Sequence, residues 1–141
     1  MPSIMVKASR SASRKNVTRR RIVILSTDAT LGLSLSLFFE NTYNVVSTSE
    51  ADVVEKALES RMIDLLIIDI GPFDTEILTL IGTVRKKNPN LPVIVMYVYQ
   101  EKIRKREEQL RSQVNMIFYK PVDLSQVSNE IRVLLAPRQM E

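Results

Sequence analysis

The sequence predicts an α/β fold built on a five-stranded parallel sheet. Short apolar runs alternate with segments of helical spacing five times, and several runs are apolar at nearly every position. A strand that is apolar on both faces must be covered on both faces, which is typical of a parallel sheet between two layers of helices. The predicted strands are Arg21–Leu25, Tyr43–Thr48, Asp64–Asp69, Leu91–Val98 and Val114–Tyr119.

The segments between the strands carry helical patterns of different strength. Residues 31–41 are ambiguous, because their leucines alternate with small residues as in a strand, while Leu31, Leu35 and Phe38 also fit a helical stripe. Their place between two strands favours a helix. Ser49, with an acid three residues later, predicts the N-cap of the next helix, and Gly71-Pro72 predicts a turn. Further helices are predicted from Ile77 to a basic end at Lys87, over Gln100–Gln113, and over Leu124–Leu135.

Composition excludes several classes of site. The 141 residues are 45% hydrophobic and 26% charged, as expected for one globular domain. The absence of cysteine and histidine excludes disulfides, thiolate or imidazole metal sites and histidine-based catalytic triads. There is no glycine-rich phosphate loop, no apolar run long enough to span a membrane and no signal-peptide core. We therefore expect a cytoplasmic protein.

Charge is unevenly distributed along the chain, and together with the apolar pattern it suggests three parts. Residues 1–27 hold seven basic and no acidic residues, which leaves thirteen basic and sixteen acidic residues in the remainder. Residues 1–19 lack apolar periodicity and are interpreted as a flexible basic arm. The domain is predicted to span residues 20–136, followed by a tail at 137–141. The arm suggests contact with nucleic acid, but it carries no aromatic residue for base stacking, so a solvated arm is the preferred interpretation.

Two charged residues lie where parallel strands are predicted to end. Asp69 follows four apolar residues, and Lys120 follows the last strand and precedes Pro121. Ligands of such sheets bind at the carboxyl ends of the strands. A carboxylate there can act as a nucleophile toward phosphorus, and a nearby lysine can pair with it and with a phosphoryl oxygen. We therefore expect Asp69 and Lys120 within a few ångströms of each other.

Four stretches of the chain resemble the receiver domain of two-component response regulators, the CheY-like family. The resemblance covers about residues 20–136 and implies a doubly wound, three-layer flavodoxin-like sandwich with strand order 2-1-3-4-5. It also implies that Asp69 is the phosphoacceptor and Lys120 the lysine that senses the phosphoryl group. The stretches are Arg21–Leu25 with its polar loop, Asp64–Ile70, Leu91–Met96, and Phe118–Leu124 with its Lys-Pro-Val-Asp-Leu motif.

The chain departs from the receiver pattern at the positions that carry its chemistry. Receivers have two adjacent acids after the first strand that bind Mg²⁺ with the phosphoacceptor, whereas this chain has Ser26 and Thr27, with Asp28 displaced by one. Any Mg²⁺ site would therefore rest on Asp28 and Asp69 and would be weak, because hydroxyls bring no charge. The switch positions, usually Thr or Ser and an aromatic residue, are Tyr97 and Ile117.

These features predict an atypical receiver that acts in signalling through protein contact. A sensor histidine kinase or another signalling protein is the expected partner, and dimerisation through the fourth helix, fifth strand and fifth helix is a further possibility. No enzymatic activity is expected beyond self-phosphorylation of Asp69. An ordinary Mg²⁺-dependent receiver is the main alternative. A flavin-binding protein, with FMN beside Tyr97 and Tyr99, is a distant one.

Overall fold

The five strands form one parallel sheet with the order β2-β1-β3-β4-β5, as predicted. The computed structural model describes residues 19–137. In chain order the elements are β1 (Arg21–Ser26), α2 (Ala29–Phe39), β2 (Asn44–Thr48), α3 (Ala51–Glu59), β3 (Leu65–Pro72), α4 (Glu76–Lys87), β4 (Val93–Val98), a 3₁₀ turn η1 (Glu101–Ile103), α5 (Arg104–Arg111), β5 (Met116–Tyr119) and α6 (Leu124–Leu135).

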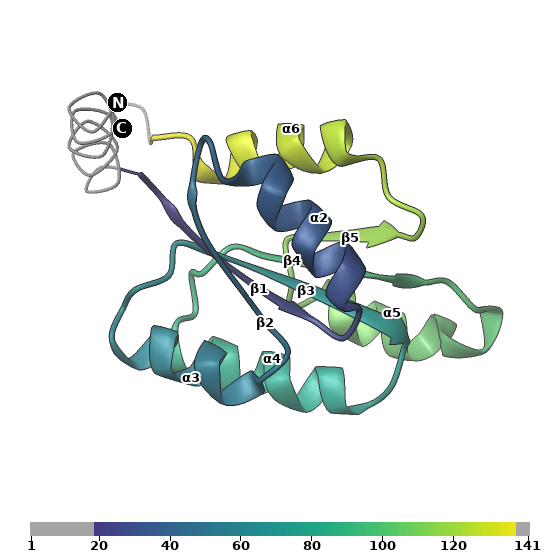
Figure 1. Cartoon of the computed structure of the whole chain (residues 1–141). Coiled ribbons are helices and arrows are strands. Elements are labelled where there is room, and N and C mark those ends of the chain that lie inside the picture. Colours follow the sequence, from purple (N-terminus) through teal and green to yellow (C-terminus); the bar gives the residue numbers. More distant parts are fainter. Residues whose placement is uncertain (1–18, 138–141) are drawn as a thin grey trace, which may run out of the picture.

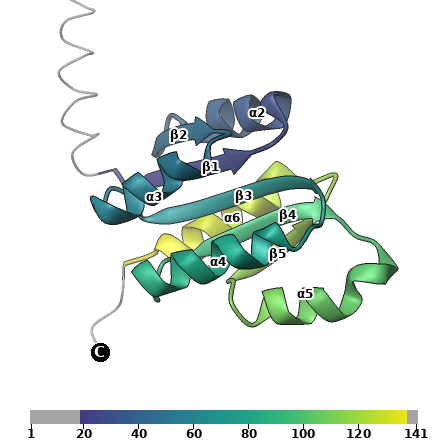
Figure 2. The same cartoon turned by 90° about the horizontal axis from the view of Figure 1, so that it is seen from below.

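Helices cover both faces of the sheet and give three layers. Figure 1 shows α2 and α6 on one face and α3, α4 and α5 on the other. Figure 2, turned to the second face, shows α4 and α5 in front of the sheet. The ambiguous leucine-rich segment is therefore a helix, because its position between two parallel strands requires a crossover. The sandwich predicted from the sequence is confirmed.

Side-chain alternation along the strands divides the core in two. Ile22 and Ile24 of β1 pack with α2 and α6, whereas Val23 and Leu25 pack with the helices on the opposite face. The central strand β3 alternates in the same way and is buried from Leu65 to Asp69. A strand that is apolar on both faces is stable in the middle of the sheet, because helices cover both of its faces there.

Two local predictions are wrong. Gly71 and Pro72 do not form a turn but continue β3, where the register with β4 shifts between Asp69 and Pro72. Proline is tolerated there because the shift interrupts the regular ladder. The helix predicted over Gln100–Gln113 is divided into η1 and α5 and ends at Arg111.

The first turn of α3 also differs from the prediction. Its N-cap residue is Glu50 rather than Ser49, and no side chain caps the helix. Most of the predicted basic arm and of the tail lies outside the described residues. Within residues 19–137, no helix combines the length and apolar character needed to cross a membrane.

Two helical glycines provide a paired test of packing. A Cβ added to Gly82 in α4 would meet nothing within 4 Å, whereas one added to Gly32 in α2 would lie 3.0 Å from Ser47 Oγ and 3.2 Å from Ser26 Cβ. We expect Gly82→Ala to raise the free energy of unfolding by about 0.5–1 kcal/mol. Gly32→Ala should be less favourable than Gly82→Ala by about 1 kcal/mol or more, because its methyl overpacks the contact with β2 and β1. Urea unfolding measures both, and equal effects would contradict the crowding.

Candidate functional site

The carboxyl ends of β1, β3 and β5 bring three side chains together. Ser26 is the last residue of β1 and lies beside Asp69 in the β1–β3 register. Lys120 directly follows β5, and its backbone N–H donates to Tyr97 O of β4. The parallel topology thus places residues separated by more than forty positions at one edge of the sheet.

Asp69 is wholly buried: its Oδ2 accepts a hydrogen bond, whereas its Oδ1 forms an ion pair but no hydrogen bond. Its side chain is 0% exposed, and Oδ1 lies 2.6 Å from Nζ of Lys120, which is itself only 16% exposed. Lys120 also donates to Ile70 O over 3.0 Å. Ser26 Oγ lies 2.7 Å from the other oxygen, Oδ2. The predicted proximity of Asp69 and Lys120 is therefore confirmed, and their roles in phosphoryl chemistry stay predictions.

Ser26, which replaces the first acid of the receiver pattern that the sequence resembles, donates from its hydroxyl to the carboxylate of Asp69. Its hydroxyl has one proton and two acceptors within 2.7 Å, Asp69 Oδ2 and Asp28 O. Asp28 O already accepts from the N–H of Gly32. A buried carboxylate is the stronger acceptor, so the proton belongs to Asp69. The hydroxyl also accepts from the N–H of Asp28 over 3.1 Å.

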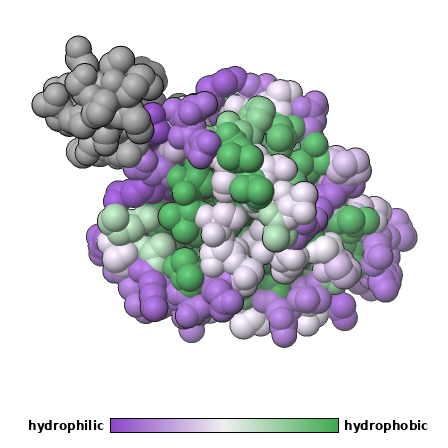
Figure 3. Space-filling model, in the orientation of Figure 1, coloured by the Kyte–Doolittle hydropathy of each residue, from purple (hydrophilic) through white to green (hydrophobic). Residues whose placement is uncertain are grey.

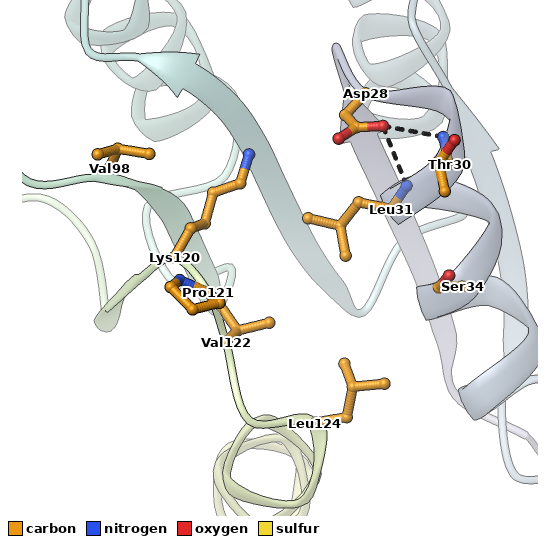
Figure 4. A pocket seen from close by; sticks show the side chains of 9 residues that line it. All are labelled: Asp28, Thr30, Leu31, Ser34, Val98, Lys120, Pro121, Val122 and Leu124. Carbon is orange, nitrogen blue, oxygen red and sulfur yellow. Dashed lines mark hydrogen bonds between the residues drawn. The ribbon is translucent and has the colours of Figure 1, made fainter.

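Asp28 is held away from this pair by the start of α2. Its Oδ1 accepts from the N–H groups of Thr30 (2.9 Å) and Leu31 (3.2 Å), which makes it the N-cap of the helix. Figure 4 shows both bonds, with the amine of Lys120 on the opposite wall of the hollow. Capping uses the carboxylate for helix stability, because it satisfies N–H groups that have no partner inside the helix.

This donor set does not fit Mg²⁺. The ion requires close to octahedral oxygen coordination and is held mainly by carboxylates. The two carboxylates here are Asp28, which caps a helix, and Asp69, which is paired with a lysine. Among residues 19–137 no group of three or more acidic, histidine or cysteine side chains is arranged to hold a metal.

The two predicted switch positions, Tyr97 and Ile117, lie in the half of the core that α3, α4 and α5 cover. Tyr97 is 0% exposed, packs in the core beneath α3, α4 and α5, and donates from its hydroxyl to Glu107 Oε2 of α5 over 2.6 Å. Ile117 is buried in the same core and has no polar group. Neither position brings a hydroxyl to Asp69, whose partners are Ser26 and Lys120.

Glu107 is the centre of a second polar cluster that the sequence reasoning missed. It is 6% exposed and accepts from Tyr97 and, over 2.7 Å, from the hydroxyl of Tyr119. Arg111 lies 3.6 Å from its other oxygen and donates to the Tyr119 hydroxyl over 2.9 Å. A signal was available in the helical spacing, because Ile103, Glu107 and Leu110 form one buried stripe and an acid in such a stripe needs buried partners.

Burial and these hydrogen bonds change the titration of the tyrosines. Burial first, and the bond to Glu107 second, raise the pKa of Tyr97 far above its ordinary value. The same two causes raise the pKa of Tyr119. Both hydroxyls therefore stay protonated at neutral pH and act as hydrogen-bond donors, which matches the carboxylate acceptor between them.

Comparison with solved structures identifies the architecture. A CheY-like receiver domain protein from Methanospirillum hungatei matches with a TM-score of 0.69 and 22% identity, over 82% of this chain and 92% of that chain. The fold is that of a receiver domain. The receiver domain of HemR from Leptospira biflexa (TM-score 0.69, 18% identity, 87% and 99% covered) and a receiver protein from Pseudomonas putida (0.68, 22%, 82% and 97%) also match. No sequence-family model and no curated protein matches the chain.

Beside the edge of the sheet that carries Asp69 and Lys120, the chain has a largely apolar hollow. Its volume is about 560 Å³, and it lies between the start of α2 and the loop from β5 to α6 (Figure 4). Lys120 and Asp28 contribute the only charges in its wall. The lining residues are Asp28, Thr30, Leu31, Ser34, Val98, Lys120, Pro121, Val122 and Leu124.

The Asp69–Lys120 pair should show strong and unequal effects on stability. Lys120→Met leaves a buried carboxylate without its cation, and we expect it to lower the free energy of unfolding by about 3–5 kcal/mol. Asp69→Asn should lower it less, because Lys120 keeps the Ile70 carbonyl and is partly exposed. The double variant should recover part of the loss of Lys120→Met.

Urea unfolding of the two single variants and the double variant gives this coupling energy. Lys87→Met is the matched control, because Lys87 pairs with Glu59 over 2.9 Å at the surface. It should change stability by about 1 kcal/mol or less. An effect of Lys120→Met as small as that of the control would show that the pair contributes nothing to stability.

The raised pKa of Tyr97 predicts a loss of stability at alkaline pH. A folded-state pKa above the ordinary value of 10.0 means that folding stabilises the protonated form. This contribution is complete below that pH and is lost as pH rises toward the folded-state pKa. We expect unfolding free energy to fall above about pH 10, and less steeply in Tyr97→Phe. Unfolding curves at several alkaline pH values measure both slopes, and identical slopes would rule out the contribution of Tyr97.

Proposed function

We propose that this protein is an atypical receiver in two-component signal transduction, and that it acts by protein contact without a phosphorylation switch. The observation that carries the proposal is the state of Asp69, the candidate phosphoacceptor. Its carboxylate is 0% exposed, with Lys120 on one oxygen and Ser26 on the other. A nucleophile must present an oxygen to the phosphorus atom, and here Oδ2 accepts from Ser26 while Oδ1, which makes no hydrogen bond, is paired with Lys120 and closed off from solvent.

The residues at the positions of the metal-binding acids support the same proposal. Phosphoryl transfer depends on cations that neutralise the developing charge and position the transferred group. Ser26 and Thr27 bring no carboxylate to the site, and Asp28 is held by the helix it caps. This arrangement supports the proposal of a degenerate Mg²⁺ site. Lys120 remains as one cation, and its charge is balanced by Asp69.

The residues that would transmit a phosphorylation signal also support the proposal. A phosphorylation signal must move an element that links Asp69 to the surface of the molecule. The position that would follow a phosphoryl group is Tyr97, whose hydroxyl is bound to Glu107 on the other side of the sheet. We infer that the conformation of α5 is set by Glu107 and its tyrosines rather than by the state of Asp69.

The partners proposed are a sensor histidine kinase or another cytoplasmic signalling protein, met by surface contact. No enzymatic activity is proposed, self-phosphorylation of Asp69 included. The flavin alternative is disfavoured, because the ring of Tyr97 is packed between those of Phe73 and Tyr119 and cannot flank a cofactor. Asp28 also occupies the N–H groups that a phosphate at the start of α2 would use.

Intact-mass measurement after incubation with a small phosphodonor tests the proposal. The wild-type chain should gain no phosphoryl adduct, with or without Mg²⁺, under conditions that label an ordinary receiver in a parallel reaction. Ser26→Asp with Thr27→Asp restores the two acids and removes the hydroxyl that covers Asp69. We expect this double variant to be labelled more than the wild type, because an added metal ligand can neutralise the phosphoryl group.

Asp69→Asn is the control for the site of labelling. A Mg²⁺-dependent adduct on the wild type that disappears in Asp69→Asn would overturn the proposal and establish the ordinary receiver. An adduct that persists in Asp69→Asn would be non-specific acylation or phosphorylation elsewhere and would be subtracted from the comparison. The fold is checked in each variant by circular dichroism.

A further inference from the structure

The hollow beside Lys120 has the size of a small-molecule site. Its volume is about 560 Å³, and pockets that hold small ligands usually measure about 300–1,000 Å³. One wall is the start of α2, residues 28–34, and the other is the loop of residues 120–124 with Val98 beside it, as Figure 4 shows. Because these segments lie far apart in the sequence, the hollow exists only in the folded chain.

The greater part of the lining is apolar. Leu31, Val122 and Leu124 are partly buried, and they pack on the core that lies between the sheet and the helices α2 and α6. The same three side chains line the hollow. Val98, at the end of β4, is 46% exposed there. A ligand that covers this surface gains about 25 cal/mol for each Å² of apolar area removed from water, so an apolar body is expected.

Both walls are held in place by hydrogen bonds of the protein itself. Asp28 caps α2, and Asp123 caps α6 by accepting from the N–H of Ser125 over 2.9 Å. The backbone N–H of Lys120 donates to Tyr97 O over 2.9 Å, which fixes the start of the loop against β4. A site that is already formed costs little conformational entropy when a ligand enters it.

The two charged residues of the lining keep unused hydrogen-bonding capacity. The ammonium of Lys120 has three N–H groups, and its only partners among residues 19–137 are Ile70 O at 3.0 Å and Asp69 Oδ1 at 2.6 Å. Asp28 uses Oδ1 to cap the helix, and its Oδ2 has no hydrogen-bond partner in the described part of the chain. The hollow therefore offers a ligand one donor and one acceptor.

The arrangement of charges disfavours a ligand that is itself charged. An anion at Lys120 would have to share that cation with Asp69, which is 0% exposed and depends on it. It would also meet a second negative charge at Asp28. A cation at Asp28 would face Lys120 across the hollow, and the apolar lining solvates neither charge. An uncharged molecule avoids both costs.

We propose that this hollow binds a small, uncharged and mainly apolar molecule, with a hydrogen-bond acceptor directed at Lys120 and a donor directed at Asp28. Its apolar body packs on Leu31, Val122 and Leu124. The site goes beyond the proposed function, because binding requires neither a phosphoryl group nor a partner protein. Since the molecule binds only where the two walls come together, binding stabilises the folded chain.

Three probes with the same two-ring body test the charge of the ligand. These are naphthamide, which is neutral, naphthoate, which is an anion, and naphthylmethylamine, which is a cation, all substituted at the same ring position. Titration of the full chain at neutral pH, followed by NMR, gives the dissociation constants. We expect naphthamide to bind at least about tenfold more tightly than either charged probe. Tighter binding of naphthoate, equal binding of all three, or no binding of naphthamide would overturn the proposal.

A bulky side chain in the hollow tests where the probe binds. Val98→Trp fills the hollow and should raise the dissociation constant of naphthamide by about tenfold or more. Val133→Trp is the matched control, because Val133 is 69% exposed on α6 and lies outside the lining. Both valines are exposed, so both variants are expected to fold, and circular dichroism checks this. Binding of naphthamide that survives Val98→Trp would overturn the proposal.

The outer surface of α2 is an alternative place for an apolar probe. Leu33 is 59% exposed and Leu37 is 56% exposed, and Figure 3 shows hydrophobic residues gathered on the face of the molecule that carries α2. Leu37 does not line the hollow, so Leu37→Glu should leave the dissociation constant of naphthamide unchanged. Loss of binding in this variant would place the probe on the surface of α2 and would overturn the proposal.

Asp28→Asn tests the polar contact without removing the helix cap. Asparagine caps helices as well as aspartate does, so α2 keeps its start. The variant removes a negative charge that faces the ligand, and it should bind naphthoate about threefold more tightly than the wild type or better. The affinity for naphthamide should change less. An unchanged preference between the two probes would show that Asp28 does not face the ligand and would overturn the proposal.

The titrations contain neither a phosphodonor nor Mg²⁺, so they are independent of the labelling experiment. A chain that binds naphthamide and is also phosphorylated on Asp69 would contradict only the proposed function. A chain that is not phosphorylated and does not bind naphthamide would contradict only the ligand site.

Discussion

The ion pair between Asp69 and Lys120 is the interaction on which this end of the molecule depends. A carboxylate that is 0% exposed requires a cation, because an isolated charge in the interior is unstable by several kcal/mol. Lys120 supplies the cation from the end of β5, and Ser26 supplies a hydroxyl from the end of β1. Asp69 on the central strand β3 therefore ties three strand ends together. The same contacts shield the carboxylate, because Oδ2 accepts from Ser26 and Oδ1, which makes no hydrogen bond, is paired with Lys120.

A second carboxylate organises the other side of the sheet in the same way. Glu107 of α5 receives the hydroxyl of Tyr97 from β4 and that of Tyr119 from β5, with Arg111 beside it. The rings add edge contacts, with centroids 5.9 Å apart for Tyr97 and Tyr119. The two clusters are built from different side chains on different faces. The side chains of the two clusters do not contact each other in the described part of the chain, and they are joined through the backbone at Lys120, whose N–H donates to Tyr97 O and which directly follows Tyr119.

The sequence was sufficient for the features that depend on apolar pattern and topology. Five apolar runs predicted the sheet, and the ends of parallel strands predicted that Asp69 and Lys120 meet. It was insufficient where a tertiary contact overrides a local signal. The sequence predicts a turn at Gly71-Pro72, yet β3 continues through these residues because the register with β4 shifts there. The sequence predicts that Glu107 is a solvated charge in a charged helix, and only the fold places two tyrosine hydroxyls beside it.

Asp28 determines where helix α2 begins, and the same residue lies beside the polar contacts of Asp69. Asp28 caps the helix with its carboxylate, and Ser26, two residues earlier, directs its hydroxyl to Asp69. Gly32, on the inner side, lets the helix approach β1 and β2 so closely that a Cβ would lie 3.0 Å from Ser47 Oγ. The close approach of α2 to the sheet therefore holds its N-cap, Asp28, next to the end of β1, where the backbone N–H of Asp28 donates to Ser26 Oγ.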